Sequence, residues 1–294
     1  MKKRLITGIF IAAVFIGVLA LTLYITRYFS PAFFTFDVFV WLLMLGASFE
    51  VSRALKRETI TPLYTLVASG TVVGAASFYL VYYLAGGDAT TLAMLAFASV
   101  IFVSALLGFV IMAARRESGG IETCFVFVYP VTVLFFMLLI NYLPTDPKRA
   151  AGMALLFLVT PLTDVFAFLV GSAVRGPKLA PKISPKKTLS GAIGGLLGGI
   201  LGGFLVYIMT RSVFFGFLGL NPLTAGFDLV HFLTLGFIGS VLTQGGDLLA
   251  SAFKRKTGIK DYGRLLPGHG GIMDRIDGMM VNAAFVYLYL LLVV

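Results

Sequence analysis

Cysteine, histidine and charge are all scarce in this sequence. Its 294 residues include one cysteine and two histidines, and only 12% of the residues are charged. The single cysteine, Cys124, excludes an internal disulfide and a cysteine-rich metal site. No GxxxxGK[ST] pattern occurs, so a Walker-type nucleotide site is not expected. These absences leave carboxylates, lysines and arginines as the side chains most able to carry chemistry.

Apolar residues dominate what is present. They make up 59% of the chain, and the mean hydropathy is +0.98, whereas soluble domains usually contain about 45–50% apolar residues. The excess extends over the whole length and no long polar linker interrupts it. We therefore expect an all-α integral membrane protein with a single membrane domain over residues 1–294.

Long apolar runs predict a polytopic bundle of about nine transmembrane helices, because a spanning helix needs about 20 apolar residues. The first run exceeds the apolar region of a cleaved signal peptide, which is about 7–15 residues long, so we expect a retained first helix. The predicted spans are 4–26, 33–55, 60–85, 91–114, 121–143, 149–174, 190–215, 226–253 and 273–294.

The distribution of basic residues orients these spans. Of the 23 lysines and arginines, 19 fall on the side of the N-terminus, and four fall on the other side: Arg27, Lys148, Arg149 and Arg211. Basic loops are typical of the cytoplasmic face. The pattern predicts a cytoplasmic N-terminus in the inner membrane. The net charge of +10 is then explained by orientation and contact with anionic lipids, with no nucleic acid as a partner.

Glycines recur every four residues in the predicted span 190–215. Two adjacent stripes result, and they comprise Gly191, Gly195, Gly199 and Gly203 in one and Gly194, Gly198 and Gly202 in the other. Small residues at this spacing let membrane helices pack closely, and helix packing is the favoured interpretation. The same stripes are compatible with a homodimer.

Charge concentrates at the end of the eighth span and the start of the ninth. Asp247, Ser251 and Lys254 are spaced i, i+4, i+7 and share one helix face, as do Asp274 and Asp277 at i, i+3. Carboxylates held close together repel unless they share a proton or bind a cation, and a hard ion such as Mg²⁺ prefers oxygen ligands. The alternative is a ladder of salt bridges with Lys254, Arg255 and Arg275.

Two further acids lie inside predicted spans. Asp164 should face a polar cavity or a partner in the cytoplasmic half of the sixth span, because an ionised carboxylate is costly in lipid. Glu50 lies three residues before Arg53, and an ion pair on one helix face is the favoured interpretation. Asp37, near a helix end, is ambiguous.

The basic loop RGPKLAPKISPKKTLSG before the seventh span is a candidate phosphate site. A helix N-terminus follows Ser184, Lys186, Lys187 and Thr188. Hydroxyls, cations and backbone N–H groups converge there on an anion. The alternative is an orientation signal alone. His269, in PGHGG, could donate to a phosphate or transfer a proton. Together with the acids, these clusters predict a cytoplasmic site that holds a metal and a polyphosphate next to lipid.

The same residues resemble the signature of the phosphatidate cytidylyltransferases, also called CDP-diacylglycerol synthases. The resemblance is carried by Ser251, Lys254, Arg255, Lys260, Asp261, Pro267, His269, Gly270, Gly271, Asp274, Arg275 and Asp277. ISPKKTLSG is similar to ISPxKTxEG, with Ser190 in place of an acid, and DVFAFLVG is similar to DxxAYxxG. GDLLAS places Ala250 where the family often has an acid. The blocks run from about Asp164 to Gly278.

The resemblance implies that CTP and phosphatidate from the inner leaflet react to CDP-diacylglycerol and diphosphate, with Mg²⁺ required and a second cation left open. It implies a catalytic region over 146–294 and a scaffold for lipid access over 1–145. The expected catalytic residues are Asp247, Asp274, Asp277, Lys254 and His269. The expected metal ligands are Asp247, Asp277, Asp274 and Asp164. The expected substrate-binding residues are Ser184, Lys187, Thr188, Ser251, Arg255, Lys260, Asp261 and Arg275.

Two other functions fit part of the pattern. An ion-coupled transporter would also have intramembrane acids and glycine stripes, but its decisive polar groups would lie near the middle of the bilayer. Another membrane transferase of phospholipids or polyprenyl phosphates would share the charge cluster. The DGxxAR and GxxxDxxxD pattern of the CDP-alcohol phosphotransferases is absent.

Overall fold

The computed structural model describes residues 13–14, 17–18, 34–56, 63–86, 89–117, 119–212, 228–265 and 270–293. Nearly all of them are helical. The helices are α2 (Phe34–Lys56), α3 (Tyr64–Leu84), α4 (Thr90–Ala114), α5 (Gly120–Val126), α6 (Val133–Leu139), α7 (Asp146–Val174), α8 (Leu189–Arg211), α10 (Leu229–Lys256) and α11 (Met273–Leu292). A π-helical stretch, η1 (Phe127–Thr132), joins α5 to α6, and a 3-10 turn, η2 (Ile140–Tyr142), follows α6.

Within these ranges, eight helical segments are long and apolar enough to cross a membrane. They match the second to ninth predicted spans to within a few residues, with Gly120–Tyr142 acting as one span. The first predicted span, 4–26, lies outside the described residues except for four positions. The prediction of an all-α, multi-pass membrane protein is confirmed. The side that each terminus faces stays a prediction.

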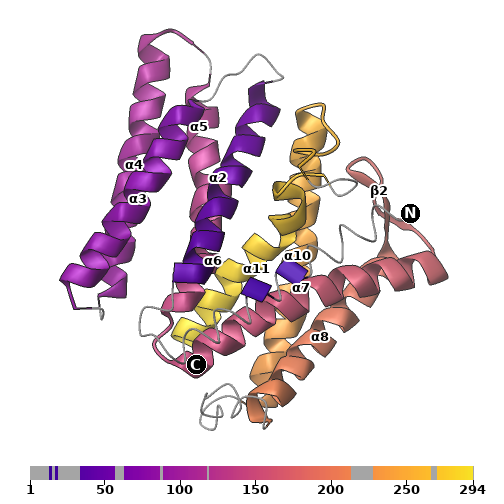
Figure 1. The fold of residues 1–294 in the computed structure, drawn as a ribbon. Helices are drawn as coiled ribbons and strands as arrows, with labels where there is room; N and C mark the ends of the chain where they lie inside the picture. Colours follow the sequence, from indigo (N-terminus) through magenta and orange to yellow (C-terminus); the bar gives the residue numbers. More distant parts are fainter. Residues whose placement is uncertain are drawn as a thin grey trace.

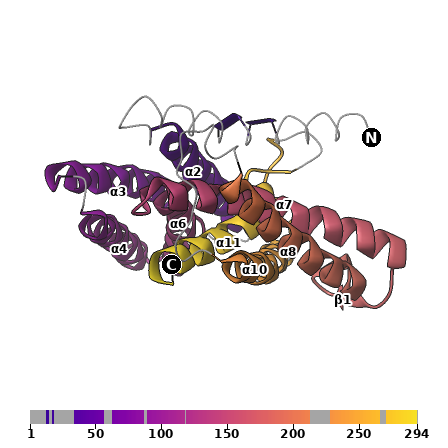
Figure 2. The same cartoon turned by 90° about the horizontal axis from the view of Figure 1, so that it is seen from below.

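The helices form an elongated bundle (Figure 1). α3 and α4 pair at one end, and α7 and α8 pair at the other. α2, α6, α10 and α11 lie between these pairs, and the view from below shows the same order (Figure 2). α10 contacts both α8 and α11, so the C-terminal helices form one continuous packed unit.

A buried polar network explains Asp37, which the sequence left ambiguous. Asp37 accepts hydrogen bonds from the hydroxyls of Tyr79 at 2.7 Å and Tyr142 at 2.6 Å, and from Nδ2 of Asn141 at 2.9 Å. Trp41 donates to the Tyr79 hydroxyl at 2.9 Å. Three donors surround a carboxyl group that is only 1% exposed, and a satisfied group of this kind can be buried without a large penalty. Asp37 therefore ties α2 to α3 and η2.

A short antiparallel ribbon occupies the loop before α8. Its strands are β1 (Lys178–Ala180) and β2 (Ser184–Thr188), paired through Lys178 with Thr188 and Ala180 with Ser184. β2 leads directly into α8, where the Thr188 hydroxyl accepts a hydrogen bond from the N–H of Gly191 at 3.1 Å. A threonine cap of this kind satisfies a helix N–H that has no partner within the helix. The sequence predicted a loop here but not its pairing.

The glycines of α8 pack against two different helices. The stripe of Gly194, Gly198 and Gly202 lies against α7, and Gly195, Gly199 and Gly203 lie against α10. A Cβ added at Gly203 would overlap the backbone oxygen of Phe232, and one at Gly198 would overlap that of Leu162. The interpretation as helix packing is confirmed, and both stripes are used within the chain.

We predict that Gly203→Ala destabilises the protein, because the new methyl group meets backbone that cannot rotate away. Overpacking of this kind costs roughly 1–3 kcal/mol. The measurement is the thermal unfolding midpoint in detergent. Gly245→Ala on α10 is the matched control, since nothing lies within 4 Å of a Cβ built there. Equal midpoints for the two variants would contradict the prediction.

Candidate active site

Polar side chains from α7, β2, α10 and α11 meet in a cavity of about 450 Å³, and β1 and α8 complete its wall. The charged residues that line it are Asp164, Lys186, Lys187, Asp247 and Arg275, and Thr188 and Gln244 also line it. Asp164 thus lies where the sequence predicted, beside a polar cavity. The residues come from positions far apart in the chain, and the packing of α8 between α7 and α10 brings them together.

One ion pair crosses this cavity. Nζ of Lys187, on β2, lies 2.5 Å from Oδ2 of Asp247, on α10. Ser251 donates to the other oxygen of Asp247 at 3.3 Å, so the predicted helix face of Asp247 and Ser251 is formed. Both partners of the pair remain partly exposed, at 28% and 34%. A ligand in the cavity can therefore reach both charges.

A second, more buried cluster lies where α10 ends and α11 begins. Nζ of Lys254 is 2.8 Å from Oδ1 of Asp274 and 3.9 Å from Oδ2 of Asp277. All three residues are at most 8% exposed. A buried cation of this kind needs carboxylate partners, since its desolvation is otherwise uncompensated. The predicted alternative of a salt-bridge ladder is partly realised here through Lys254. Among the described residues, Arg255 and Arg275 form no salt bridge.

Asp274 holds the loop that precedes α11. Its Oδ2 accepts from the backbone N–H groups of Tyr262 at 2.8 Å and Gly271 at 2.9 Å, while its Oδ1 faces Lys254. The side chain of Asp274 is only 3% exposed, against 11% for Asp277 and 34% for Asp247, so Asp274 is the weakest of the three candidates for a metal ligand. Its evident role is to fix the loop that carries the charged residues.

Tyr262 covers the buried lysine. Nζ of Lys254 lies 5.3 Å from the centre of the Tyr262 ring, within the range of a cation–π contact. Phe253 stacks on Tyr262 and on Phe125, which extends the aromatic wall. Burial raises the pKa of the Tyr262 hydroxyl, and nearby negative charges raise it further. The tyrosine therefore stays neutral at physiological pH.

Glu50 reaches this region from the N-terminal half of the chain. Its two oxygens accept from the backbone N–H groups of Ile272 at 3.0 Å and Met273 at 2.9 Å, at the start of α11. A Cβ added at Gly263 or Gly271 would overlap the Glu50 carboxylate. The predicted ion pair with Arg53 is not formed among the described residues, because both oxygens of Glu50 face α11.

The chemistry of the acids suits a hard cation. Asp277 interacts electrostatically with Asp247 and Asp164, and all three offer oxygen ligands of the kind that Mg²⁺ prefers. Within the described ranges, no three histidine, cysteine, aspartate or glutamate side chains are grouped closely enough to hold a metal ion. Two carboxylates with substrate phosphates and water completing the coordination would therefore fit better than a closed protein site.

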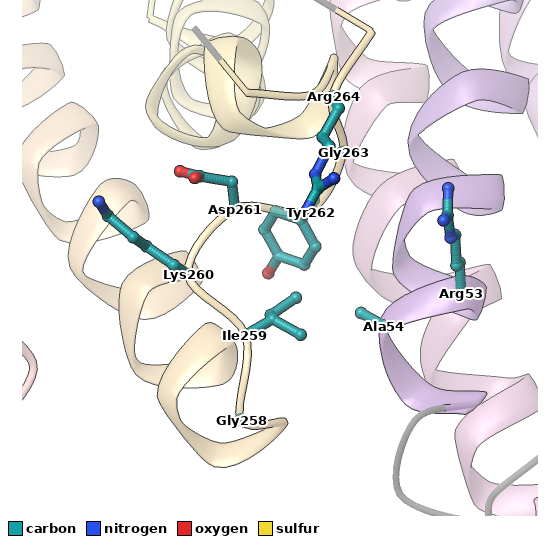
Figure 3. A pocket seen from close by; sticks show the side chains of 9 residues that line it. All are labelled: Arg53, Ala54, Gly258, Ile259, Lys260, Asp261, Tyr262, Gly263 and Arg264. Carbon is teal, nitrogen blue, oxygen red and sulfur yellow. The ribbon is translucent and has the colours of Figure 1, made fainter. Parts of the chain in front are cut away.

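Other predicted residues lie outside the cavity. Arg255 donates to the backbone oxygens of Ile183 at 3.2 Å and Ile259 at 3.3 Å, so it joins the ribbon to the segment after α10. Ser184 lies on β2 but does not line the cavity. Lys260 and Asp261 line a separate cavity (Figure 3). His269 lies outside the described residues.

Sequence reasoning missed two residues of this region. Glu50 was assigned to a pair on its own helix, although an isolated acid in an apolar span was the available signal. Gln244 lines the cavity and donates to the backbone oxygen of Ala192 at 3.3 Å. The sequence indicated Gln244 only through its position three residues, or about one helical turn, before Asp247.

Comparison with known proteins assigns this chain to a family. A model of the cytidylyltransferase family matches residues 2–293. The chain belongs to the cytidylyltransferase family. The resemblance seen in the signature residues is thereby confirmed, and the family match extends beyond them to nearly the whole sequence.

Relatives within the family share a name. A stretch of 144 residues is 32% identical to a phosphatidate cytidylyltransferase of Brucella abortus, covering 49% of this chain and 48% of that protein. A Helicobacter pylori protein of the same name is 42% identical over 79 residues, covering 27% and 29%. Phosphatidate cytidylyltransferase 1 of Arabidopsis thaliana is 52% identical over 60 residues, covering 20% and 14%. The aligned stretch thus spans half or less of these relatives.

We predict that Glu50→Ala lowers both stability and activity in this cytidylyltransferase-family chain. It would leave two backbone N–H groups at the start of α11 without acceptors, at a cost of roughly 1–3 kcal/mol each. The measurements are the thermal midpoint and the catalytic rate on the same preparation. Glu117→Ala, at an exposed position after α4, is the control. A Glu50→Ala variant matching that control in both would contradict the assigned contact.

Proposed function

We propose that the chain transfers a cytidylyl group from CTP to phosphatidate, giving CDP-diacylglycerol and diphosphate in phospholipid biosynthesis. The observation that carries this proposal is the cavity that brings Asp164 and Asp247 together with three cations, Lys186, Lys187 and Arg275. Both substrates are anionic, and the cavity offers cations for their phosphates. The names of the aligned relatives supply the substrate class.

The proposed reaction needs no protein nucleophile. A phosphate oxygen of phosphatidate attacks the α-phosphorus of CTP, and the bond from that phosphorus to the diphosphate group breaks. In such transfers, catalysis is mostly positioning and neutralisation of charge. Lys187 and Arg275 would hold phosphates in the cavity, while Thr188 would orient them. Ser251 does not line the cavity and would position Asp247 through its hydrogen bond. Lys254 would act from the buried cluster beside Asp277.

We infer that Asp247 and Asp277 hold Mg²⁺, while Asp164 adds negative charge nearby without coordinating the ion. A bound divalent cation would neutralise the phosphates and the departing diphosphate. The pair of Lys187 with Asp247 neutralises the Asp247 carboxylate before ligands arrive. When a nucleotide enters, Lys187 can turn to a phosphate and free the Asp247 carboxylate. A second cation stays a prediction.

Lipid access follows from the position of Phe168. This residue lines the cavity and is 72% exposed on the outer surface of α7. We propose that phosphatidate enters sideways there from the inner leaflet, with its head group reaching Asp164 and Arg275. The site would face the cytoplasm in the inner membrane, as the distribution of basic residues predicts. The homodimer stays a prediction without support from the glycine stripes, which pack within the chain.

A transporter fits the site less well. The cations of the cavity lie at helix starts, with Lys186 and Lys187 directly before α8 and Arg275 in the first turn of α11, whereas transport would place the decisive polar groups near the middle of the bilayer. Within the described residues, the acid nearest to the middle of a span, Asp164, belongs to the same cavity as Lys187. The other membrane transferases would share the cavity but not the family match.

We predict that Asp277→Asn lowers turnover by at least roughly 10–100-fold, since neutralising a metal ligand costs at least as much as losing its support. The assay follows transfer of label from radioactive CTP into the lipid phase with purified protein, phosphatidate and Mg²⁺. Asp146→Asn is the control, because Asp146 is an exposed acid at the far end of α7 that pairs with Arg149. If the folded wild type labels no lipid with any nucleotide, the proposed function is wrong.

We also predict that EDTA abolishes labelling and that excess Mg²⁺ restores it. The physical reason is that two carboxylates and two anionic substrates cannot approach closely without a cation between them. Excess Ca²⁺ in place of Mg²⁺ serves as the comparison, since Ca²⁺ prefers more ligands and a looser geometry. Undiminished labelling in EDTA would exclude the metal requirement.

A further inference from the structure

A second cavity of about 340 Å³ lies between the end of α2 and the segment that follows α10. Arg53 and Ala54 form its α2 side, and residues 258–264 form the other side (Figure 3). In this view, Lys260 and Asp261 point away from α2. The cavity is distinct from the one that holds Asp164 and Asp247, because the two share no lining residue.

The charge of this cavity is unbalanced. Arg53, Lys260 and Arg264 line it, and Asp261 is its one lining acid. None of the three cations forms a salt bridge within the described part of the chain. Arg53 on one wall and Arg264 on the other favour an anion in the space between them. A guanidinium group offers a planar fork of donors that matches a phosphate, and two of the three cations are arginines.

The walls of the cavity are fixed rather than mobile surface. Ile259 and Tyr262 are buried, and their N–H groups bond to Lys254 O at 2.9 Å and to Asp274 Oδ2 at 2.8 Å. One turn before Arg53, Glu50 caps α11 and touches Gly263. Arg53 is therefore held opposite the loop by the same contacts that position α11. A loop that served only to orient the protein in the membrane would not need this framework.

We propose that this cavity is a second phosphate-binding subsite, in which Arg53 and Arg264 hold a phosphate group. The phosphate belongs either to the nucleotide or to a lipid head group. Through Asp274, the loop that binds it also contacts Lys254. The inference deepens the proposed function and rests on it for the choice of these two ligands.

The test measures equilibrium binding by calorimetry on the full chain in detergent. The probes are CTP and a short-chain, water-soluble phosphatidate, each titrated separately into wild type, Arg53→Ala and Arg264→Ala. Arg115→Ala is the control, because it removes one positive charge after α4 and lies outside both cavities. Losing a charge-assisted phosphate contact should lower the affinity for the affected ligand about tenfold to hundredfold.

Weaker binding of CTP alone in the two variants would identify the nucleotide as the source of the phosphate, and weaker binding of phosphatidate alone would identify the lipid. Unchanged binding of both ligands, relative to Arg115→Ala, would overturn the inference. So would a wild-type chain that binds neither ligand. If Arg53→Ala does not fold, Arg264→Ala decides, because Arg264 is exposed on the loop.

Turnover on the same preparations separates this inference from the proposed function. If the wild type binds a ligand, the variants lose that binding and the wild type shows no turnover, the subsite stands and the proposed reaction is refuted. Normal turnover with unchanged binding in both variants would support the proposed reaction and refute the subsite. A folded Arg53→Lys variant should recover only part of the affinity, because lysine keeps the charge but not the paired donors.

Discussion

The buried ammonium group of Lys254 is the constraint around which the C-terminal helices are arranged. A cation that is 8% exposed must be neutralised by its own chain, because little of it is open to water or to lipid head groups. Asp274 and Asp277 supply that neutralisation, and both lie in the first turns of α11. The end of α10, the loop and the start of α11 therefore form one electrostatic unit, and the more open cavity of Asp247 and Lys187 lies beside it.

The N-terminal half contributes to this unit through one carboxylate. A helix that begins within a membrane protein leaves N–H groups that need acceptors, and Glu50 supplies two to α11. The division into a scaffold over 1–145 and a catalytic region over 146–294 stays a prediction. Glu50 shows that the first region contacts the second where the charged loop is fixed. The close fit of Gly263 and Gly271 to Glu50 also explains why two loop positions are glycine, since a side chain there would overlap the Glu50 carboxylate.

Local patterns predicted what local geometry controls. Apolar runs located the spans, and helical spacing placed Asp247 beside Ser251 and the glycines on two packed faces. Contacts between distant residues were out of reach, since nothing in the sequence around Glu50 indicates Ile272, 222 residues away. The signature residues formed one group in the sequence, yet Lys260 and Asp261 line a different cavity from Asp247. Periodicity cannot indicate such a division, because a loop can turn its neighbouring side chains to opposite sides.

The two glycine faces of α8 affect how far apart the walls of the cavity lie. Asp164 belongs to α7 and Asp247 to α10, and α8 touches both helices through glycines. Where no side chain intervenes, the gap between two neighbouring helices is set by the diameter of a bare backbone. The spacing of α7 and α10 from α8 then depends on main-chain contact and not on side-chain rotamers at the glycine positions. A methyl group added on either glycine face would push one of the two helices outward and widen the cavity.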